Sequence, residues 1–219
     1  MSDALRQAIA EQQDTYRNLF QKFGRSEEAL CWSKNKQAER FAALTRFMPD
    51  GGADFLDYGC GLGDLKSWLA IERPQFRYQG VDILPEFIDS NRQQYPSASF
   101  SCIGGCEDVT GEFDYCAISG VFNLRTADLA THEAMIAATL THLFGRVRRA
   151  LSCDFLAPDV SYRKPDSHHQ EIAPLAALAS TLSRRYIIDK SYLPYEFCVT
   201  IFKDSEIDAS RTIYRRAAG

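Results

Sequence analysis

Three glycines at alternate positions form the pattern with the clearest chemical meaning in this sequence. They lie in the segment Gly59-Cys60-Gly61-Leu62-Gly63, directly after the apolar run 53–58 and before a helical pattern at 64–71. Glycine has no Cβ, so the main chain of such a turn can approach a ligand closely. The turn also directs the N-terminus of the following helix toward the bound molecule. We therefore expect a ligand site at residues 59–63.

Two carboxylates around this turn indicate which ligand it binds. Asp82 ends the next apolar run, about twenty residues downstream, where its carboxylate can accept hydrogen bonds from both hydroxyls of a ribose. Asp57 precedes the turn, whose spacing is G-x-G-x-G rather than the G-x-G-x-x-G of dinucleotide sites. A carboxylate repels a diphosphate and attracts an ammonium or sulfonium group. These features favour S-adenosylmethionine over a dinucleotide.

Strand-like runs alternate with helical patterns from residue 53 onward, which predicts crossover connections and a parallel sheet. The expected strands are 53–58, 76–81, 99–103, 113–118 and 147–156. Two further strands, 186–188 and 197–202, are joined closely enough to form a hairpin that adds an antiparallel edge to the sheet. The first fifty residues read as two helices, the first marked by Leu5, Ile9 and Tyr16.

Composition restricts the class of protein. The chain has 219 residues and a formal net charge of −4, so no overall positive field draws it to nucleic acid or anionic lipid. Its longest central uncharged stretch, 115–124, is about half of a membrane span, and the polar N-terminus does not resemble a signal peptide. Seven cysteines without a C-x-x-C pair favour a reduced, cytoplasmic protein with neither disulfides nor a metal site.

The turn and the second strand together resemble the class I S-adenosylmethionine-dependent methyltransferases. The resemblance rests on Gly59-Cys60-Gly61-Leu62-Gly63 behind Leu56-Asp57, followed by Val81-Asp82-Ile83, and covers roughly residues 30–203. It implies an α/β fold of the Rossmann-like kind, with a seven-stranded, mostly parallel sheet, helices on both faces and an antiparallel C-terminal hairpin strand. We divide the chain into an N-terminal helical cap (1–50), the methyltransferase domain (51–206) and a C-terminal tail (207–219).

The resemblance also implies a cofactor site for S-adenosyl-L-methionine, with S-adenosyl-L-homocysteine as product. Asp57 would lie on the methionine side, Asp82 at the ribose and Ile83 against the adenine, while Glu107 or Asp108 reads the adenine amino group. The other residues expected at the cofactor are Trp32, Gln37, Arg40, Gly59, Cys60, Gly61, Gly63, Ser119, Gly120 and Asn123. Arg40 could pair with the methionine carboxylate in a forked geometry; alternatively, its helix has a solvated charged face.

The acceptor side is expected in the long polar stretch 157–171, because such loops beyond a strand's carboxyl end carry function. His168 or His169 could act as a general base, and Tyr162 is a comparable candidate. A substrate-orienting or capping role for either histidine is the alternative. Asn123 would reach toward the acceptor, or else cap a helix. His132 and His142, on a predicted helix, read as surface or packing residues.

The function predicted from the sequence is methyl transfer to a small molecule, such as a metabolite or natural-product intermediate. A nucleic-acid acceptor is disfavoured by the acidic composition and by the lack of an Asn/Asp-Pro-Pro-Tyr/Phe motif after the fourth strand. Two alternatives remain: a non-catalytic or regulatory nucleoside-binding module of the same fold, and an NAD(P)-dependent oxidoreductase. The protein would act as a monomer, or as a homodimer through its N-terminal helices.

Overall fold

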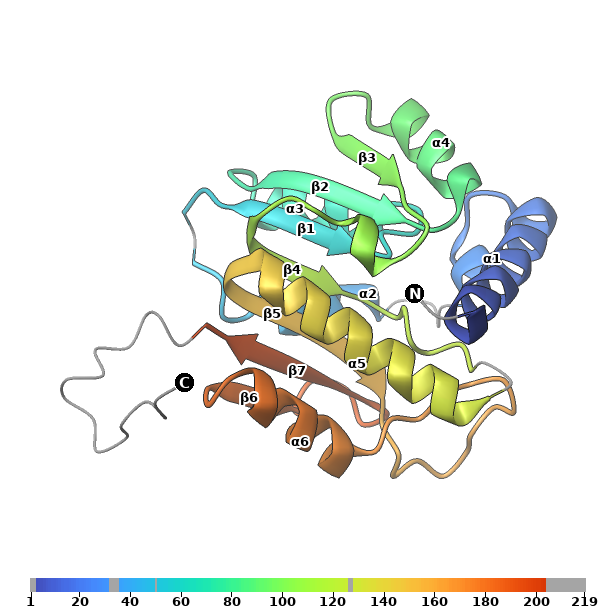
Figure 1. Ribbon diagram of the computed structural model, residues 1–219. Helices are drawn as coiled ribbons and strands as arrows, with labels where there is room; N and C mark the ends of the chain where they lie inside the picture. Colours follow the sequence, from blue (N-terminus) through green and yellow to red (C-terminus); the bar gives the residue numbers. More distant parts are fainter. Residues whose placement is uncertain (1–2, 32–35, 50, 126–127, 204–219) are drawn as a thin grey trace.

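A seven-stranded sheet forms the centre of the computed structural model, which describes residues 3–31, 36–49, 51–125 and 128–203. The strand order is β3-β2-β1-β4-β5-β7-β6, and every strand is parallel to the others except β7, which runs antiparallel to both of its neighbours (Figure 1). The strands are β1 (Asp54–Tyr58), β2 (Arg77–Asp82), β3 (Ser99–Cys102), β4 (Phe113–Ile118), β5 (Val147–Leu156), β6 (Tyr186–Asp189) and β7 (Glu196–Phe202). The predicted seven-stranded α/β fold is confirmed.

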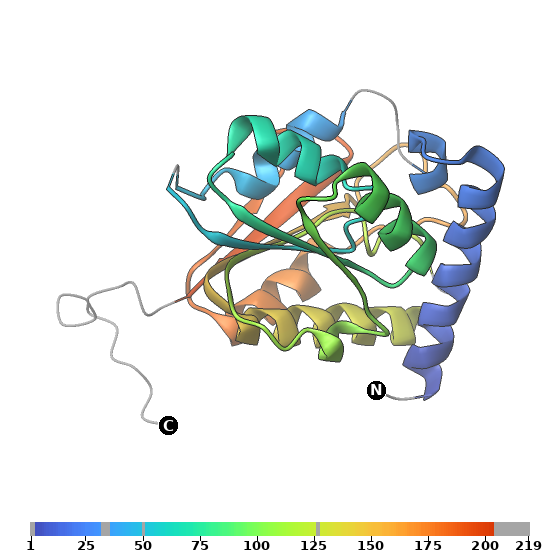
Figure 2. The same ribbon diagram turned by 90° about the horizontal axis from the view of Figure 1, so that it is seen from above.

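Helices cover both faces of this sheet. They are α1 (Asp3–Phe23), α2 (Gln37–Thr45), α3 (Asp64–Glu72), α4 (Pro85–Gln94), α5 (Leu129–Arg146) and α6 (Ile172–Leu182), with short 3-10 turns η1 (Glu27–Leu30) and η2 (Cys106–Asp108). Figure 2 shows α2 and α3 on one side of the sheet and α5 and α6 on the other. Successive side chains of a strand point to opposite faces, so Phe55 packs in the cluster with α2 and α3, and Leu56 packs beneath α5.

The C-terminal hairpin differs from the prediction in one respect. The antiparallel strand does not lie at the edge, because β7 is inserted between β5 and β6. Six of its seven residues are buried, whereas β6 has none that is fully buried. A strand with two covered faces and main-chain groups on both sides gains most from an interior position, so β7 lies inside and the shorter β6 forms the edge.

Helix α1 crosses the carboxyl ends of the parallel strands (Figures 1 and 2). Two polar contacts and an aromatic pair fix its C-terminal half there: Gln13 Nε2 donates to the Ile83 carbonyl at 2.6 Å, and Arg17 Nε pairs with Glu86 at 2.8 Å. The Phe20 ring meets Phe87 edge-to-face at 5.3 Å. The helix therefore closes the end of the sheet from which the glycine turn projects.

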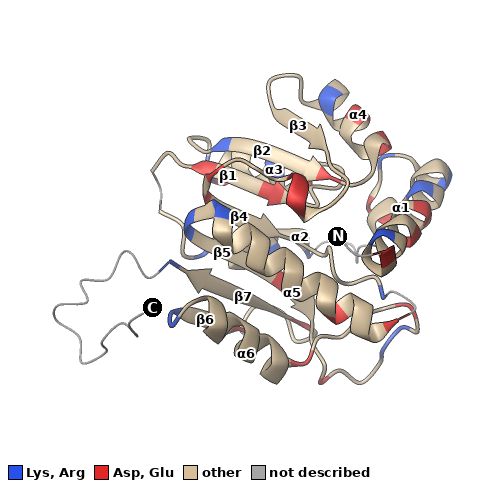
Figure 3. Ribbon diagram, viewed as in Figure 1, with Lys and Arg blue, Asp and Glu red and all other residues tan. Residues whose placement is uncertain are grey.

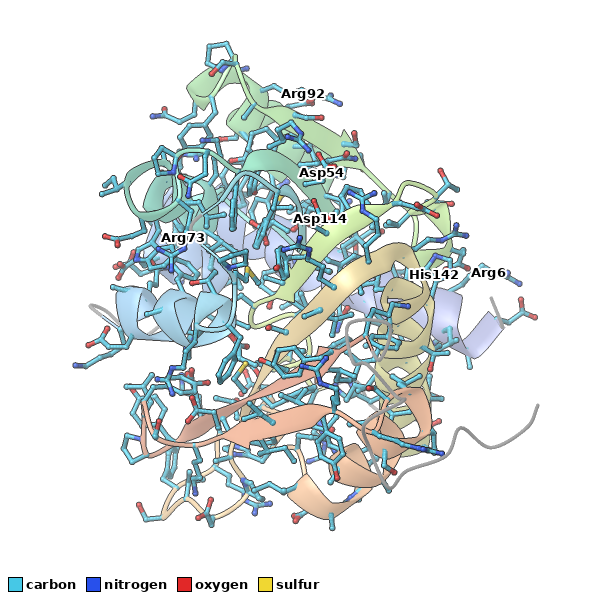
Figure 4. All side chains as sticks on the ribbon, turned by 90° about the vertical axis from the view of Figure 1, so that its left-hand side faces the viewer. Arg6, Asp54, Arg73, Arg92, Asp114 and His142 are labelled. Carbon is cyan, nitrogen blue, oxygen red and sulfur yellow. The ribbon has the colours of Figure 1, made fainter. Side chains whose placement is uncertain are left out.

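The opposite, amino end of the sheet carries a cluster of ion pairs. Asp54 and Asp114, which lie side by side in Figure 4, share Arg148: its Nη2 is 2.8 Å from Asp54 and its Nε 3.0 Å from Asp114. Arg77 Nε also lies 2.6 Å from Asp54. These cations hold the pKa of both carboxyl groups below the usual range. Because the cluster is largely exposed, it ties strand ends together and is open to screening by salt.

Within the described ranges, none of the helices combines the length and the apolar character that crossing a bilayer requires.

Candidate active site

A cavity of about 820 Å³ lies at the carboxyl ends of β1, β2 and β4. It is lined by the glycine turn, by the inner side of α1, by η2 and α5, and by the connection between β5 and α6 (residues 157–171), here called the 157–171 loop. The volume falls within the range of roughly 300–1,000 Å³ found for small-molecule sites. The open end of a parallel sheet, where strand order reverses between β1 and β4, is where α/β folds bind ligands.

The glycine turn has the backbone that its sequence predicts. Gly59, Gly61 and Gly63 all have positive φ, at 73°, 51° and 77°. A Cβ on Gly59 would lie 2.2 Å from Val121 Cγ2, and one on Gly61 would lie 3.1 Å from Leu30 Cδ2. Both glycines line the cavity, as does Cys60 between them.

Gly63 has a different role from the one expected. It does not line the cavity, and a Cβ there would lie 2.8 Å from the ring of Tyr95 and 3.2 Å from Asn91. The third glycine therefore permits close packing of α4 against the start of α3 rather than the approach of a ligand.

Asp82 shapes the turn from the end of β2. One carboxylate oxygen accepts from the Gly61 N–H at 2.9 Å, and the other accepts from the Leu84 N–H at 2.9 Å. Burial raises the pKa of this carboxyl to about 6, against these hydrogen bonds, which lower it. A carboxylate has about four lone-pair sites, so Asp82 can accept further hydrogen bonds from ligand hydroxyls while it holds the turn.

Asp57 is buried at the end of β1 and also lines the cavity. Tyr78 Oη donates a hydrogen bond of 2.7 Å to its carboxylate. Burial raises the pKa of Asp57 to about 7; the Tyr78 hydrogen bond opposes this rise, and the nearby Asp82 and Asp64 add to it. A cation bound beside Asp57 would favour the ionised form, so this carboxyl is suited to an ammonium or sulfonium partner.

The two acidic candidates after β3 are separated by the structure. Glu107 lines the cavity. Asp108 is exposed, does not line it, and accepts a hydrogen bond from the Gly104 N–H at 2.6 Å, so it stabilises its own loop. Ile83 lies on the cavity wall as expected. Figure 3 shows acidic residues at the carboxyl ends of β1 and β2 and on η2. This end of the cavity therefore favours a cationic ligand.

Ser119 and Gly120 line the cavity at the end of β4, and Asp154 of β5 holds them in place. Ser119 Oγ donates to one Asp154 oxygen at 2.8 Å, and the Gly120 N–H donates to the other at 2.7 Å. Burial raises the pKa of Asp154 to about 6, although Arg40 lowers it. Sequence reasoning missed Asp154, although a single carboxylate inside the apolar run 150–156 was a usable signal.

Arg40 reaches the cavity wall, but its forked contact differs from the expected one. Its Nε donates to Glu196 at 2.6 Å, its Nη2 pairs with the other Glu196 oxygen, and its Nε lies 3.6 Å from Asp154. The guanidinium fork thus faces a protein carboxylate at the start of β7, and Arg40 is buried there. The pairing stabilises both Arg40 and Glu196, because a buried charge without a counter-charge is strongly unfavourable.

The other two N-terminal candidates for the cofactor site, Gln37 and Trp32, are not found on the cavity wall among the described residues. Gln37 Nε2 lies 3.3 Å from Asp64, which lines the cavity, but Gln37 itself does not line it. Trp32 lies outside the described residues.

The two adjacent histidines of the 157–171 loop have opposite environments. His168 is buried, does not line the cavity, and has its Nε2 3.1 Å from Gln170 Oε1 and its ring centroid 4.3 Å from that of His132. Its expected role as a base is therefore replaced by packing of the loop against α5. His132, also buried in that contact, has its pKa lowered to about 4 by burial and by His168.

His169 lines the cavity, and its Nδ1 lies 2.7 Å from the Ala157 carbonyl. A carbonyl can only accept, so Nδ1 carries the proton and the neutral ring keeps its lone pair on Nε2. Tyr162 is at the rim of the cavity and is 72% exposed. Of the three catalytic candidates, His169 is the one that lines the cavity with its ring held by a hydrogen bond to the main chain.

Helix α1 contributes side chains to the wall that sequence reasoning did not single out. Leu5, Ile9, Gln12 and Tyr16 all line the cavity. Asn123, which was expected, lines it from the end of β4, where its N–H donates to the Gly120 carbonyl at 3.2 Å. In the part of the chain that the structure describes, no group of three or more His, Cys, Asp or Glu side chains could hold a metal ion.

A comparison with models of protein families gives no match. A curated protein of Mycobacterium tuberculosis strain H37Rv, "Putative methyltransferase Rv1506c", is 31% identical over 159 residues, which cover 68% of this chain and 92% of that protein.

Solved structures resemble the fold at lower identity. Magnesium protoporphyrin IX methyltransferase (ChlM) from Synechocystis PCC 6803 with bound SAH has a TM-score of 0.62 and 15% identity, over 87% of this chain and 93% of that one. The DhpI–SAH complex has a TM-score of 0.62 and 14% identity, over 91% and 97%. A TehB-like SAM-dependent methyltransferase from Corynebacterium glutamicum has 0.59 and 18%, over 85% and 96%.

Proposed function

The chain belongs to the class I S-adenosylmethionine-dependent methyltransferases, and from this premise we propose that it transfers the methyl group of S-adenosyl-L-methionine to a small-molecule acceptor. The observation that carries the proposal is the acid-lined end of the cavity. There, a glycine turn lies between two buried carboxylates, Asp57 and Asp82, and its glycines present main chain without a Cβ to the ligand. A cationic nucleoside with a free ribose has complementary groups for each of these features.

Each cofactor-binding residue would have a distinct task. Asp57 would hold the ammonium group of the methionine part, and Asp82 would accept from the ribose hydroxyls. Ile83 would pack against the adenine, with Glu107 beside its amino group. Gly59, Cys60 and Gly61 would present main chain to the ligand, and Ser119 and Gly120 would line the methionine part.

Methyl transfer asks little covalent chemistry of the protein. The bound cofactor supplies a methyl group that its sulfonium has already activated, and the thioether S-adenosyl-L-homocysteine leaves when the acceptor forms the new bond. The chain's own task is to align the acceptor with that methyl and to exclude water. Where the acceptor is a hydroxyl, His169 Nε2 would take its proton, since Nδ1 is held by Ala157.

The first test is calorimetry with S-adenosyl-L-homocysteine. The wild-type protein should bind it, and Asp82→Ala should weaken binding by about 1–3 kcal/mol through the lost hydrogen bonds. Asp89→Ala removes an exposed carboxylate on α4 and is the control that should leave binding unchanged. No heat with the wild type, or a fluorescence titration in which NADH binds instead, would overturn the proposal.

The second test asks for transfer itself. Incubation with labelled S-adenosyl-L-methionine and a metabolite extract should give a new methylated mass. With that acceptor, His169→Gln should lower kcat by about a hundredfold or more, with binding of S-adenosyl-L-homocysteine unchanged. His142→Gln changes another cavity-lining histidine, whose Nε2 lies 3.0 Å from the Val109 carbonyl, and should have the smaller effect. Cofactor binding without any methylated product would instead favour the non-catalytic module.

Three further points belong to the proposal. The apolar side of α1 packs within the chain, through Leu5, Ile9, Tyr16 and Phe20, which supports a monomer rather than a dimer through this helix. We propose the same division of the chain into a helical cap, a methyltransferase domain and a tail, at residues 50 and 206. Helix α2 of the cap packs in one hydrophobic cluster with β1 and α3 of the domain. A cytoplasmic location is proposed from the cysteine pattern.

A further inference from the structure

Helix α1 presents an apolar stripe to the cavity, and one amide interrupts it. Leu5, Ile9, Gln12 and Tyr16 recur at the spacing of a single helix face. Gln12 is only 5% exposed, and its Nε2 is buried without a hydrogen-bond partner among the described residues. The next residue, Gln13, behaves as expected of a helix amide, since its Nε2 donates to the Ile83 carbonyl.

A second unsatisfied atom belongs to Asn123, which follows β4 and lines the same cavity. The main chain of Asn123 is fixed on both sides, because its N–H donates to Gly120 and its carbonyl accepts from the His168 N–H at 2.9 Å. Its side-chain Oδ1 is buried and has no hydrogen-bond partner within the described ranges. The main chain of this cavity-lining residue is therefore held in place, while its side-chain acceptor is left without a partner.

These two atoms make complementary demands on a ligand. The Gln12 nitrogen needs a hydrogen-bond acceptor, and the Asn123 oxygen needs a donor. Buried polar groups without partners lower the stability of a folded protein, and they are rare for that reason. Two of them on one cavity wall point to a ligand that satisfies both.

Gln12 belongs to a helix face that shares contacts with the expected cofactor residues and with the 157–171 loop. Toward the C-terminal end of α1, Gln13 contacts Ile83 next to Asp82. Toward the N-terminal end, Leu5 and Ile9 pack against the large hydrophobic cluster that includes both Ile83 and, from the loop, Val160. The stripe thus shares neighbours with both halves of the cavity.

The rest of this wall is aromatic and electrically balanced. Tyr16, Phe122, Tyr162 and Tyr195 line the cavity. Lys164 and Asp166 line it with opposite charges, and the Arg40 guanidinium is paired with Glu196. Aromatic side chains favour a planar aromatic partner, and a balanced wall gives no counter-charge to an ionic one.

We propose that Gln12 and Asn123 orient the methyl acceptor, and that this acceptor is an uncharged aromatic molecule with two polar groups. One group accepts a hydrogen bond from Gln12, and the other is a hydroxyl that donates to Asn123. The inference rests on the proposed function, because it assigns the acceptor half of the same cavity.

The first experiment uses the protein without ligands. Gln12→Met keeps the length of the side chain and its helix propensity but removes the unsatisfied amide, so Tm should rise. Gln7→Met is the matched control, because Gln7 lies on the exposed side of the same helix and donates to Glu11 at 3.1 Å. A Tm for Gln12→Met that falls, or that shifts no more than the control, would mean that the amide is already satisfied and would overturn the proposal.

The second experiment measures binding to the complex with S-adenosyl-L-homocysteine. The fluorescent dihydroxynaphthalene isomers are the probes, and naphthol is the analogue with one hydroxyl fewer. At least one diol should bind the wild-type complex more tightly than naphthol, and Gln12→Met should lower its affinity about tenfold, toward that of naphthol. The affinity for S-adenosyl-L-homocysteine should not change, in this variant or in Gln7→Met.

Two results would overturn the proposal while leaving the methyltransferase assignment intact. In one, no diol binds the wild-type complex better than naphthol. In the other, Gln12→Met weakens S-adenosyl-L-homocysteine itself, which would place the amide at the cofactor. Failure of the wild type to bind S-adenosyl-L-homocysteine is a separate result, and it would remove the proposed function as well.

Discussion

The two halves of the cavity are built in different ways. Around the glycine turn, the polar contacts of Asp82 stay within the unit formed by β1, α3 and β2 and the residues that follow β2: Asp82 holds Gly61 and Leu84. On the acceptor side, the wall is assembled from α1, the end of β4, the 157–171 loop and the start of β7, which are far apart in the sequence. Its central ion pair, between Arg40 and Glu196, joins residues 156 positions apart.

This difference suits a cofactor site that many proteins share and an acceptor site that is particular to one protein. A half built mainly from one β1–α3–β2 unit can be kept while the other half changes with its acceptor. We assign the amide of Gln12 and the Nε2 atom of His169 to the variable half.

The largest expected effect comes from breaking the long-range pair. Arg40→Met leaves Glu196 and Asp154 buried without their cation and should lower the free energy of unfolding by about 3–5 kcal/mol. Denaturant unfolding measures this loss. Arg40→Met combined with Glu196→Leu should be less destabilised than Arg40→Met alone, since one of the two buried carboxylates left without a cation is gone. If the double variant loses as much free energy of unfolding as the two single variants together, the Arg40–Glu196 pair does not stabilise this wall.

The next effect tests the local half. Gly59→Ala forces a Cβ at positive φ to within 2.2 Å of Val121 and should cost about 1–3 kcal/mol, with loss of affinity for S-adenosyl-L-homocysteine. Gly145→Ala is the control: Gly145 lies in α5 with nothing within 4 Å of its added Cβ, and the change should raise stability by up to about 1 kcal/mol. If both variants behave alike in thermal unfolding and in calorimetry, the turn does not have the tight geometry described.

The third prediction concerns pH and Asp57. Its pKa in the folded protein, about 7, lies above the value of about 4 expected for an unfolded Asp, so the folded state holds the extra proton between these values. Stability of the protein without ligands should therefore fall as pH rises from 4 to 7, while affinity for cationic S-adenosyl-L-methionine should rise between pH 6 and 8. Asp57→Asn should remove the Asp57 part of both trends. Calorimetry in buffers of different ionisation enthalpy should detect the proton released on binding, and equal heats in all buffers would contradict the assignment.

The smallest effect is expected at the amino end of the sheet. Arg148→Ala removes the partly exposed cation shared by the half-buried carboxylates Asp54 and Asp114. The resulting fall in Tm should be small and should vanish at high salt, because such pairs are screened. Affinity for S-adenosyl-L-homocysteine should be the same as in the wild type. A change in that affinity would mean that the two ends of the sheet are coupled.

What could be predicted from the sequence follows the same division. The strands, the turn and the positions of Asp57, Asp82 and Ile83 on the cavity wall were readable because the residues concerned are neighbours in one supersecondary unit. The insertion of β7 and the Arg40–Glu196 contact were not, since hydrophobic alternation gives the existence of a strand but not its place in the order. His168 and His169 have identical side chains in adjacent positions, and only the path of the loop decides that one packs against His132 while the other reaches the cavity.

The insertion of β7 has a consequence for how the protein is made. Residues near the start of the chain leave the ribosome first, yet the buried cation of Arg40 finds its counter-charge only when Glu196, at the beginning of the last described strand, has been synthesised. Until then β5 has an open edge, and the Asp154 that shapes the turn after β4 has an incomplete environment. A nascent chain can thus form the nucleoside half early, but it cannot complete the acceptor wall before Glu196 and the rest of β7 have been synthesised.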